Sequence, residues 1–249
     1  MCDWQSHEVC EQFAFSINMK AVILQSNYIP WKGYFDQMNI ADVFVIYDEV
    51  QYTKNDWRNR NKIKTANGLT WLTIPIRQEK LSQRIIDTEV SGNEWRKKHW
   101  NSISMSYSRA SYFKQYRSLF EELYLNSSET YLSSINYNFF VAINEALGIK
   151  TKLVWSNELN LVEGKSERLV DICKKVGADE YISGPAAKDY LQTDLFEKEK
   201  IKVSWMEYSG YKEYNQLYPP FEHGVSILDL IFNEGPDSFR FLKSFNQKQ

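Results

Sequence analysis

The feature that most constrains this sequence is a pair of short apolar runs joined by a turn and a helix-length segment. The runs are Ala-Val-Ile-Leu at 21–24 and Val-Phe-Val-Ile-Tyr at 43–47. Pro30 and Gly33 keep the first run from continuing as a strand, and residues 34–40 are suited to a short helix. Fully apolar runs joined by a helical crossover are typical of neighbouring parallel strands with both faces covered. The sequence therefore predicts an α/β fold with a mostly parallel, Rossmann-like open sheet.

The same rhythm returns in the second half of the chain. Further strands are expected at 70–76, 152–155, 180–182 and 201–207. The strand at 70–76 is expected to close the first half of the sheet, and the strand at 201–207 to be the last in it.

Helical periodicity fills the middle and the end of the chain. The expected helices lie at 92–108, 112–125, 128–147, 166–175 and 226–232. The first three predict a helical insertion at about 92–148, and the last predicts a C-terminal helical segment. We expect an N-terminal extension at 1–18 and one α/β domain at 19–249.

Composition excludes several classes of protein. The 249 residues carry 30 basic and 32 acidic side chains, so the formal charge of −2 favours neither nucleic acid nor an anionic membrane as a partner. No apolar run approaches the roughly 20 residues that a membrane helix needs. The three cysteines form no C-x-x-C pair and the three histidines are dispersed, so we expect no metal site and a soluble protein of the reducing cytoplasm. A small-molecule substrate is expected, and the oligomeric state is left open.

The ends of the first two expected strands carry polar and aromatic side chains. Ligands of open parallel sheets bind beyond the carboxyl ends of the strands, because the loops diverge there. The candidate binding residues at these two ends are Gln25, Tyr28, Trp31 and Gln51, and Asp48 is a candidate general base.

The next segment mixes basic, amide and aromatic residues. Its candidate binding residues are Lys54, Trp57, Arg58, Asn59, Arg60 and Asn61. Arginine forks onto phosphate, asparagine offers a paired donor and acceptor, and tryptophan stacks on a flat ring. A solvated charged loop explains the same letters, and both interpretations stay open.

Two further places attract attention. His99 follows Lys98 and shares a helix face with Trp95. His99 is the first candidate for a general base, and Lys98 is a candidate binding residue. Local packing of a helix histidine is the alternative for His99. Ser183 and Gly184 end an expected strand before Pro185, where free backbone N–H groups suit a phosphate or carboxylate. An ordinary helix cap explains these letters equally well.

A Tyr- and Pro-rich segment at 208–223 is long enough to be a lid or a wall of the site. Asp229, in the helix that follows, lies between apolar neighbours, and a buried carboxylate normally needs a partner. We expect it to pin this segment rather than to serve the site. Cys173 lies in the apolar pattern of an expected helix and is expected in the core.

Several ordered motifs resemble one known family. They are L-Q-x-x-Y-x-P-W-x-G-Y-F, A-D-x-F-V-x-x-D-x-V-Q-Y-x-K and W-x-N-R-N-K-I-K, followed by similar segments to the C-terminus. From Met19 onward the chain is similar to the WbqC-like protein family. The resemblance implies a protein of bacterial O-antigen or other surface-polysaccharide gene clusters, with a part in acylating amino sugars. Many relatives carry His-Gln where this chain has Gln25, so we expect no imidazole there.

Three functions follow as hypotheses. The first is a transferase that N-acylates a nucleotide-linked amino sugar, with ATP or an acyl-CoA as co-substrate. The second is an adenylate-forming or nucleotidyl-transferring enzyme, which the order of elements resembles although the usual histidines are missing. The third is a non-catalytic module that binds single-stranded nucleic acid through Trp57 and its basic neighbours. The sequence contains no P-loop, dinucleotide-binding or serine-hydrolase motif.

Overall fold

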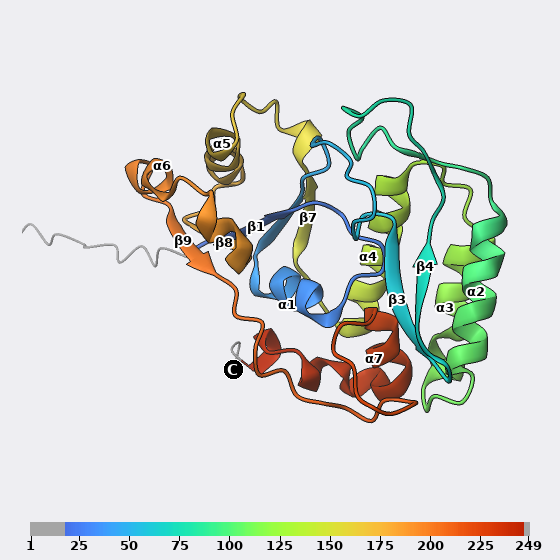
Figure 1. Ribbon diagram of the computed structural model, residues 1–249. Coiled ribbons are helices and arrows are strands. Elements are labelled where there is room, and N and C mark those ends of the chain that lie inside the picture. Colours follow the sequence, from blue (N-terminus) through green and yellow to red (C-terminus); the bar gives the residue numbers. More distant parts are fainter. Residues whose placement is uncertain (1–17, 247–249) are drawn as a thin grey trace, which may run out of the picture.

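The computed structural model describes residues 18–246 and contains a five-stranded, all-parallel sheet (Figure 1). The strands are β1 (Lys20–Leu24), β2 (Val43–Ile46), β7 (Lys152–Trp155), β8 (Glu180–Ser183) and β9 (Lys202–Trp205). Their order across the sheet is β7-β2-β1-β8-β9, and β9 is an edge strand as expected. The predicted α/β class is confirmed.

The strands are apolar throughout because both faces of the sheet are covered. Val22 and Phe44 point to one face and pack in a large core with α1 (Lys32–Ile40) and α4 (Leu132–Leu147). Ala21 and Val45 point to the other face and pack in a smaller core with α5 (Ser166–Val176) and α6 (Thr193–Lys198). Cys173 lies in this second core, as expected, and burial raises the pKa of its thiol to about 12.

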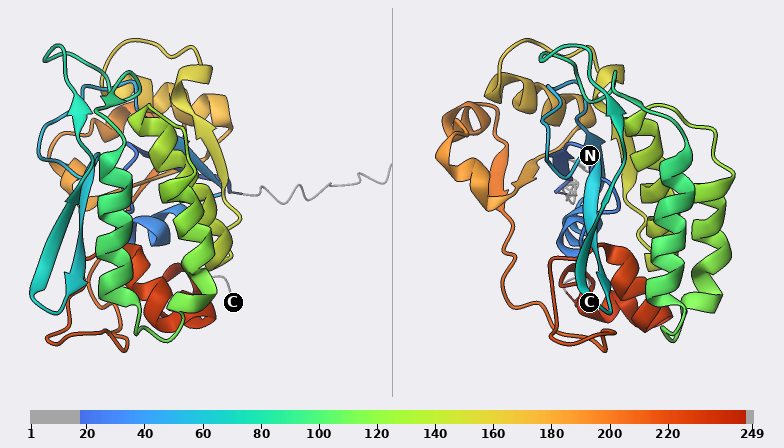
Figure 2. Two further views of the ribbon diagram at one scale, coloured as in Figure 1. Left: turned by 90° about the vertical axis from the view of Figure 1, so that its right-hand side faces the viewer. Right: turned by 45° about the vertical axis from the view of Figure 1, so that its right-hand side comes forward.

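The expected helices in the middle of the chain are α2 (Glu94–Tyr107), α3 (Phe113–Leu125) and α4. The helices α2 and α3 contact each other along their length, and α3 contacts the C-terminal helix α7 (Ile227–Glu234). Figure 2 shows this helical layer on one side of the parallel sheet.

One expectation about the sheet was wrong. The segment expected as a sheet strand at 70–76 instead forms β4 (Gly68–Thr73), which pairs antiparallel with β3 (Arg60–Thr65) outside the parallel sheet. The turn at Ala66-Asn67 leads into Gly68 at φ +99, a conformation that suits glycine. Ile63 and Leu72 on the inner face are buried, and the hairpin runs beside α2 (Figure 2).

A second short ladder, β5 (Ile76–Arg77) with β6 (Glu89–Val90), follows the hairpin. The remaining elements are short 3-10 helices at Ser156–Glu158, Pro185–Asp189, Gly235–Phe241 and Ser244–Asn246. The segment after Gly184 is therefore one 3-10 turn rather than the α-helix start that Pro185 suggested.

The Tyr- and Pro-rich segment is tied to the body of the molecule through Asp229. This buried carboxylate accepts hydrogen bonds from Tyr107 Oη at 2.8 Å, Tyr214 Oη at 2.7 Å and Gln216 Nε2 at 2.8 Å. Asp229 thus pins the segment, as expected. No helix within residues 18–246 combines the length and apolar character needed to cross a bilayer. The predicted N-terminal extension lies outside the described residues except for Asn18.

Candidate functional site

The strand order creates a switch point between β1 and β8. From β1 the chain builds outward to β2 and β7, and it then returns to place β8 on the other side of β1. Connections leave such a pair of strands in opposite directions and open a crevice at their carboxyl ends. A cavity of about 480 Å³ lies there, within the size range of small-molecule sites. We call it the switch-point cavity; its lining includes Gln25, Tyr47, Lys165, Ser166, Arg168, Tyr181, Ser183, Gly184 and Tyr190.

This cavity brings together three predicted binding residues from distant parts of the sequence. Gln25 follows β1, while Ser183 ends β8 and Gly184 follows it. Lys165 and Arg168 were missed by the sequence reasoning. They belong to a Gly-Lys-Ser run and the first turn of α5, and that run ahead of a helix was a signal that could have pointed to them.

A second cavity, of about 300 Å³, is lined by Asn27, Pro30, Trp31, Trp57, Asn61 and Gly224. We call it the tryptophan cavity. The Trp31 ring meets Tyr208 and Tyr211 edge-on, with ring centroids 5.4 Å and 5.6 Å away. The Trp57 ring packs against the Trp71 ring at an interplanar angle of 35°, with ring centroids 5.5 Å apart. Three predicted residues, Trp31, Trp57 and Asn61, therefore share this cavity.

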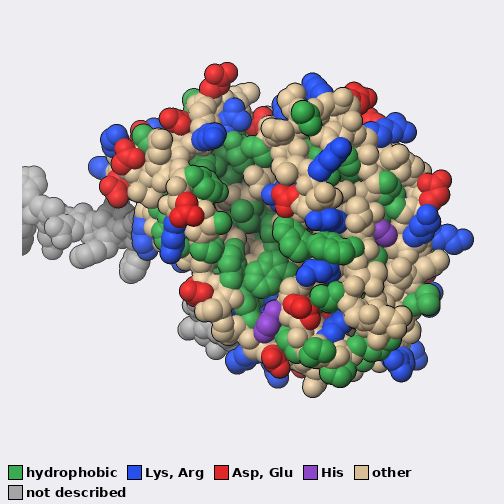
Figure 3. Space-filling model, in the orientation of Figure 1, with side chains coloured by type: hydrophobic (Ala, Val, Ile, Leu, Met, Phe, Trp, Pro, Cys, Tyr) green, Lys and Arg blue, Asp and Glu red, His purple; other side chains and the backbone are tan. Residues whose placement is uncertain are grey.

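Arg58 lines neither cavity but bonds a residue of each, and its Nη2 also lies 3.4 Å from Asp56 Oδ2. Its Nη2 donates to Gln25 Oε1 at 2.9 Å, and its Nη1 donates to Asn27 Oδ1. Gln25 lines the switch-point cavity and Asn27 lines the tryptophan cavity, so the guanidinium lies between them. Figure 3 shows a hollow on this face, lined mainly by hydrophobic side chains, between the part with α5 and α6 and the part with β3 and β4.

Asp48 lies beneath the loop that follows β1. Its carboxylate is 1% exposed and accepts hydrogen bonds from Ser26 N at 2.7 Å, Ser26 Oγ at 2.7 Å and Ser133 Oγ at 2.6 Å. Burial raises the pKa of this carboxyl above its ordinary value, and the bonds from the two serines act in the opposite direction. Asp48 lines neither of the two cavities, and its contacts fix the loop that carries Gln25 and Asn27.

His99 lies in the core under the β3–β4 hairpin. Its Nδ1 is 2.9 Å from Tyr28 Oη, which is 2.5 Å from Tyr124 Oη, and the ring also bonds the backbone of Thr73. Burial lowers the pKa of His99 to about 4, so the imidazole is neutral at pH 7. His99 and Tyr28 line neither cavity, and the hydrogen bonds join α2 to the loop after β1 and to α3.

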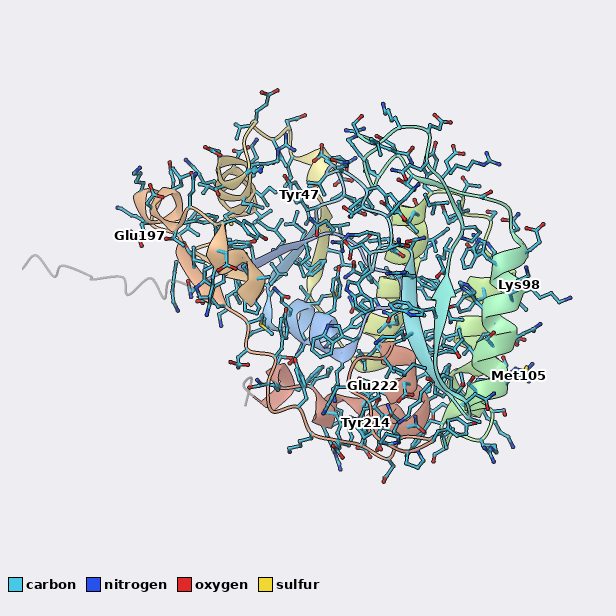
Figure 4. All side chains as sticks on the ribbon, viewed as in Figure 1. Tyr47, Lys98, Met105, Glu197, Tyr214 and Glu222 are labelled. Atoms are coloured by element: carbon cyan, nitrogen blue, oxygen red, sulfur yellow. The ribbon has the colours of Figure 1, made fainter. Side chains whose placement is uncertain are left out.

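None of the remaining predicted residues lines either cavity. Asn59 is buried and donates to Ile74 O at 2.7 Å. The Arg60 guanidinium lies 4.4 Å from the centre of the Trp71 ring. Gln51 donates to Leu81 O at 2.7 Å, and Lys54 is exposed. Lys98 projects outward from α2 at the edge of the view in Figure 4, far from Tyr47.

Comparisons with known proteins identify the family of this chain. A model of the WbqC-like protein family matches residues 25–241, which include the whole lining of the tryptophan cavity and all of the switch-point cavity except Ile23 and Leu24. The chain is 44% identical over 228 residues to "Uncharacterized protein Rv1507c" of Mycobacterium tuberculosis, covering 90% of this chain and 99% of that one. The comparison with solved structures gives no match. The chain therefore belongs to the WbqC-like protein family.

Proposed function

We propose that this protein is an enzyme of bacterial surface-polysaccharide biosynthesis that forms an amide on the amine of a nucleotide-linked amino sugar. One observation carries the proposal: the Arg58 side chain bonds one lining residue of each of two cavities, one with two basic side chains in its lining and one with two tryptophans. A nucleotide-linked sugar also has two chemically different ends joined by a charged diphosphate. A guanidinium between the cavities suits such a link, because arginine binds phosphate with paired N–H groups.

The tryptophan cavity suits the sugar. Trp31 and Trp57 offer flat apolar faces to the C–H groups of a sugar ring. Asn27 accepts from Arg58 through Oδ1, and its Nδ2 donates to no residue within 18–246, which leaves a donor for the ligand. Hydrophobic side chains surround the hollow in Figure 3, and an apolar surrounding suits this reaction because water competes with an amine for an activated acyl group.

The proposed reaction has two forms that balance. With an acyl-CoA, the neutral sugar amine attacks the thioester carbonyl, the C–S bond breaks, and the released thiol takes the proton. With an amino acid, ATP first forms an acyl adenylate and releases pyrophosphate; the amine then displaces AMP. Both forms need an unprotonated amine and donors to the developing oxyanion. Asp48 and His99 contribute in this proposal as residues that position the loop after β1.

The test is a panel of nucleotide-linked 3-amino and 4-amino sugars, each incubated with acyl-CoA or with ATP and amino acids. Product masses identify the reaction, because amide formation adds the acyl group to the sugar with loss of one hydrogen. A mass shift confined to one sugar class supports the proposal. The proposal is contradicted if every sugar in the panel is returned unchanged although the acyl-CoA and the ATP are intact.

The strand order favours a second candidate, an adenylate-forming or nucleotidyl-transferring enzyme. The loop after β1 and the Ser183-Gly184 turn after β8 meet in one cavity at the switch point, where many parallel sheets bind a nucleotide. Release of pyrophosphate from ATP in the presence of an amino acid, without any amino sugar, would favour this candidate.

A further inference from the structure

The switch-point cavity has an unusual balance of charge. Its lining contains Lys165 and Arg168 but no aspartate or glutamate. Within residues 18–246, neither of these two basic side chains forms an ion pair with a carboxylate. Acidic residues outnumber basic ones in the whole chain, 32 to 30, so the cavity departs from the average of the sequence. Two unpaired cations favour an anionic ligand.

Arg168 is held in place without using its whole guanidinium. Its Nε donates to Val162 O at 3.0 Å, and its Nη1 makes a long contact of 3.5 Å to Tyr47 Oη. Nη2 donates to no residue in the described part of the chain. The backbone contact fixes the side chain, and the outer N–H groups remain for a ligand. A fixed guanidinium with free outer donors is suited to two oxygens of one phosphate.

Two buried hydroxyls add further donors. Ser166 Oγ accepts from Gln192 N at 3.2 Å, and Ser183 Oγ accepts from Tyr181 Oη at 3.2 Å. Each hydroxyl also has one hydrogen to donate. Neither finds an acceptor among residues 18–246, although both serines are at most 5% exposed. Buried donors without acceptors are costly, so these hydroxyls indicate a ligand with acceptor oxygens.

The nearby carboxylates do not compensate these donors. The Glu167 carboxylate folds over Gly164, where an added Cβ would lie 2.5 Å from Glu167 Oε2. Glu163 is exposed, and neither glutamate lines the cavity. The one side-chain amide oxygen in the lining, Gln25 Oε1, already accepts from Arg58. The cavity therefore presents donors and cations and few acceptors.

We infer that the switch-point cavity binds a phosphate group through the Arg168 guanidinium, with Lys165 and the hydroxyls of Ser166 and Ser183 as further donors. This deepens the proposed function and rests on it for the identity of the ligand. A nucleotide-linked sugar, ATP and coenzyme A all carry phosphate esters. In the first case the nucleotide end occupies this cavity and the sugar points past Arg58 to the tryptophan cavity.

The experiment is calorimetric titration of the full chain with UDP, ATP, coenzyme A and inorganic phosphate, at low and at high salt. We expect at least one organic phosphate to saturate the protein at low salt and to bind more weakly at high salt. Arg168→Gln should weaken that binding about tenfold or more, because hydrogen bonds between charged groups are strong. Arg168→Lys keeps the charge but loses the paired N–H groups. Its affinity should lie between that of wild type and that of Arg168→Gln.

Arg117→Gln is the matched control, because Arg117 is exposed on α3 and pairs with Glu121. It should bind like wild type. Ser183→Ala gives a second readout that does not depend on the fold around Arg168, and it should also weaken binding. Thermal unfolding checks each variant. No saturable binding of any phosphorylated probe, or wild-type affinity in both Arg168→Gln and Ser183→Ala, would overturn the inference.

The failure of this inference differs from failure of the proposed function. Phosphate binding that depends on Arg168, without any amide product, leaves the cavity assignment intact and removes the reaction. Amide formation by Arg168→Gln with unchanged KM keeps the reaction and removes the phosphate site. The probe that binds distinguishes the sources: UDP indicates the nucleotide-linked sugar, ATP the adenylating route, and coenzyme A the acyl donor.

Discussion

The indole of Trp31 packs against the backbone of Gly33 in the first turn of α1. A methyl group added at Gly33 would lie 2.2 Å from Trp31 Cζ2, closer than any real contact. Glycine at 33 thus sets where one wall of the tryptophan cavity stands. Gly33 lies within a helix, where any residue can adopt the backbone conformation. Glycine is required here because the indole lies so close to its backbone.

Gly33→Ala should therefore destabilise the protein by about 1–3 kcal/mol, because the added methyl overpacks this contact. Helix propensity alone predicts that replacing glycine by alanine stabilises the protein. A loss of stability would therefore point to the contact with the indole. The measurement is urea unfolding of Gly33→Ala alone and in a Trp31→Ala background. Without the indole the same change should be neutral or stabilising. Stabilisation in both backgrounds would contradict the account.

Arg58 should matter more to ligand binding than its neighbour Arg60. Arg58→Leu removes the bonds to Gln25 and Asn27 between the cavities, and we expect about tenfold weaker binding of a nucleotide-linked amino sugar. Arg60→Leu is the control, because its guanidinium covers the Trp71 ring outside the cavities. Calorimetry compares the two. Equal losses would show that Arg58 has no special place in the site.

Asp229 should control the stability of the Tyr- and Pro-rich segment at 208–223. Asp229→Ala leaves the hydroxyls of Tyr107 and Tyr214 without their acceptor, and we expect a loss of at least about 2 kcal/mol. Limited proteolysis should then cut within this segment at lower protease concentrations. Asp237→Ala, which removes only an exposed pair with Arg240, should cost less than about 1 kcal/mol. Matching cleavage patterns in both variants would rule out the pinning role.

His99 should make stability depend on pH. Burial lowers its pKa in the folded protein to about 4, against an ordinary value of 6.5. Between these values the unfolded chain binds a proton that the folded chain does not, so stability falls as the pH is lowered from 6.5 to 4. This contribution is up to about 3 kcal/mol, at about 1.4 kcal/mol per pKa unit.

Chemical unfolding of wild type and His99→Gln at a series of pH values measures this contribution as a difference between their curves. The variant should lose stability less steeply over the same range. His223→Gln is a comparison variant: the pKa of His223 is lowered in the same direction, but His223 is less buried, so this variant should flatten the curve less than His99→Gln does. Parallel curves for wild type and His99→Gln would mean that the buried imidazole is not the cause.

The parallel sheet could be predicted because its strands are buried on both faces and leave continuous apolar runs such as 43–47. The hairpin was missed because most of β3 is polar or charged: buried Asn61 and Ile63 alternate with half-buried Arg60 and Lys62, and Lys62 lies opposite Trp71. Such alternation over a charged segment resembles a loop. The Asn67-Gly68 pair was the available turn signal.

The site was predicted in part for a related reason. Gln25, Ser183 and Gly184 follow strands, and the topology of a parallel sheet places them at one edge. Arg168 is a helix residue, and apart from the Gly-Lys-Ser run just before it, nothing local separates an arginine that lines a cavity from one on a solvated face. His99 was expected at the site, but it is buried under the β3–β4 hairpin. The local sequence around His99 does not show that the hairpin covers this helix face.

The central claim is that one ligand spans both cavities. The most direct test is calorimetric titration of the wild-type chain with a nucleotide-linked amino sugar, with its nucleotide alone and with the free sugar. We predict that the linked ligand binds more tightly than either part, and that Trp57→Ala weakens the linked ligand while leaving the nucleotide unaffected. Equal affinity for the linked ligand and the nucleotide, unchanged by Trp57→Ala, would contradict the account.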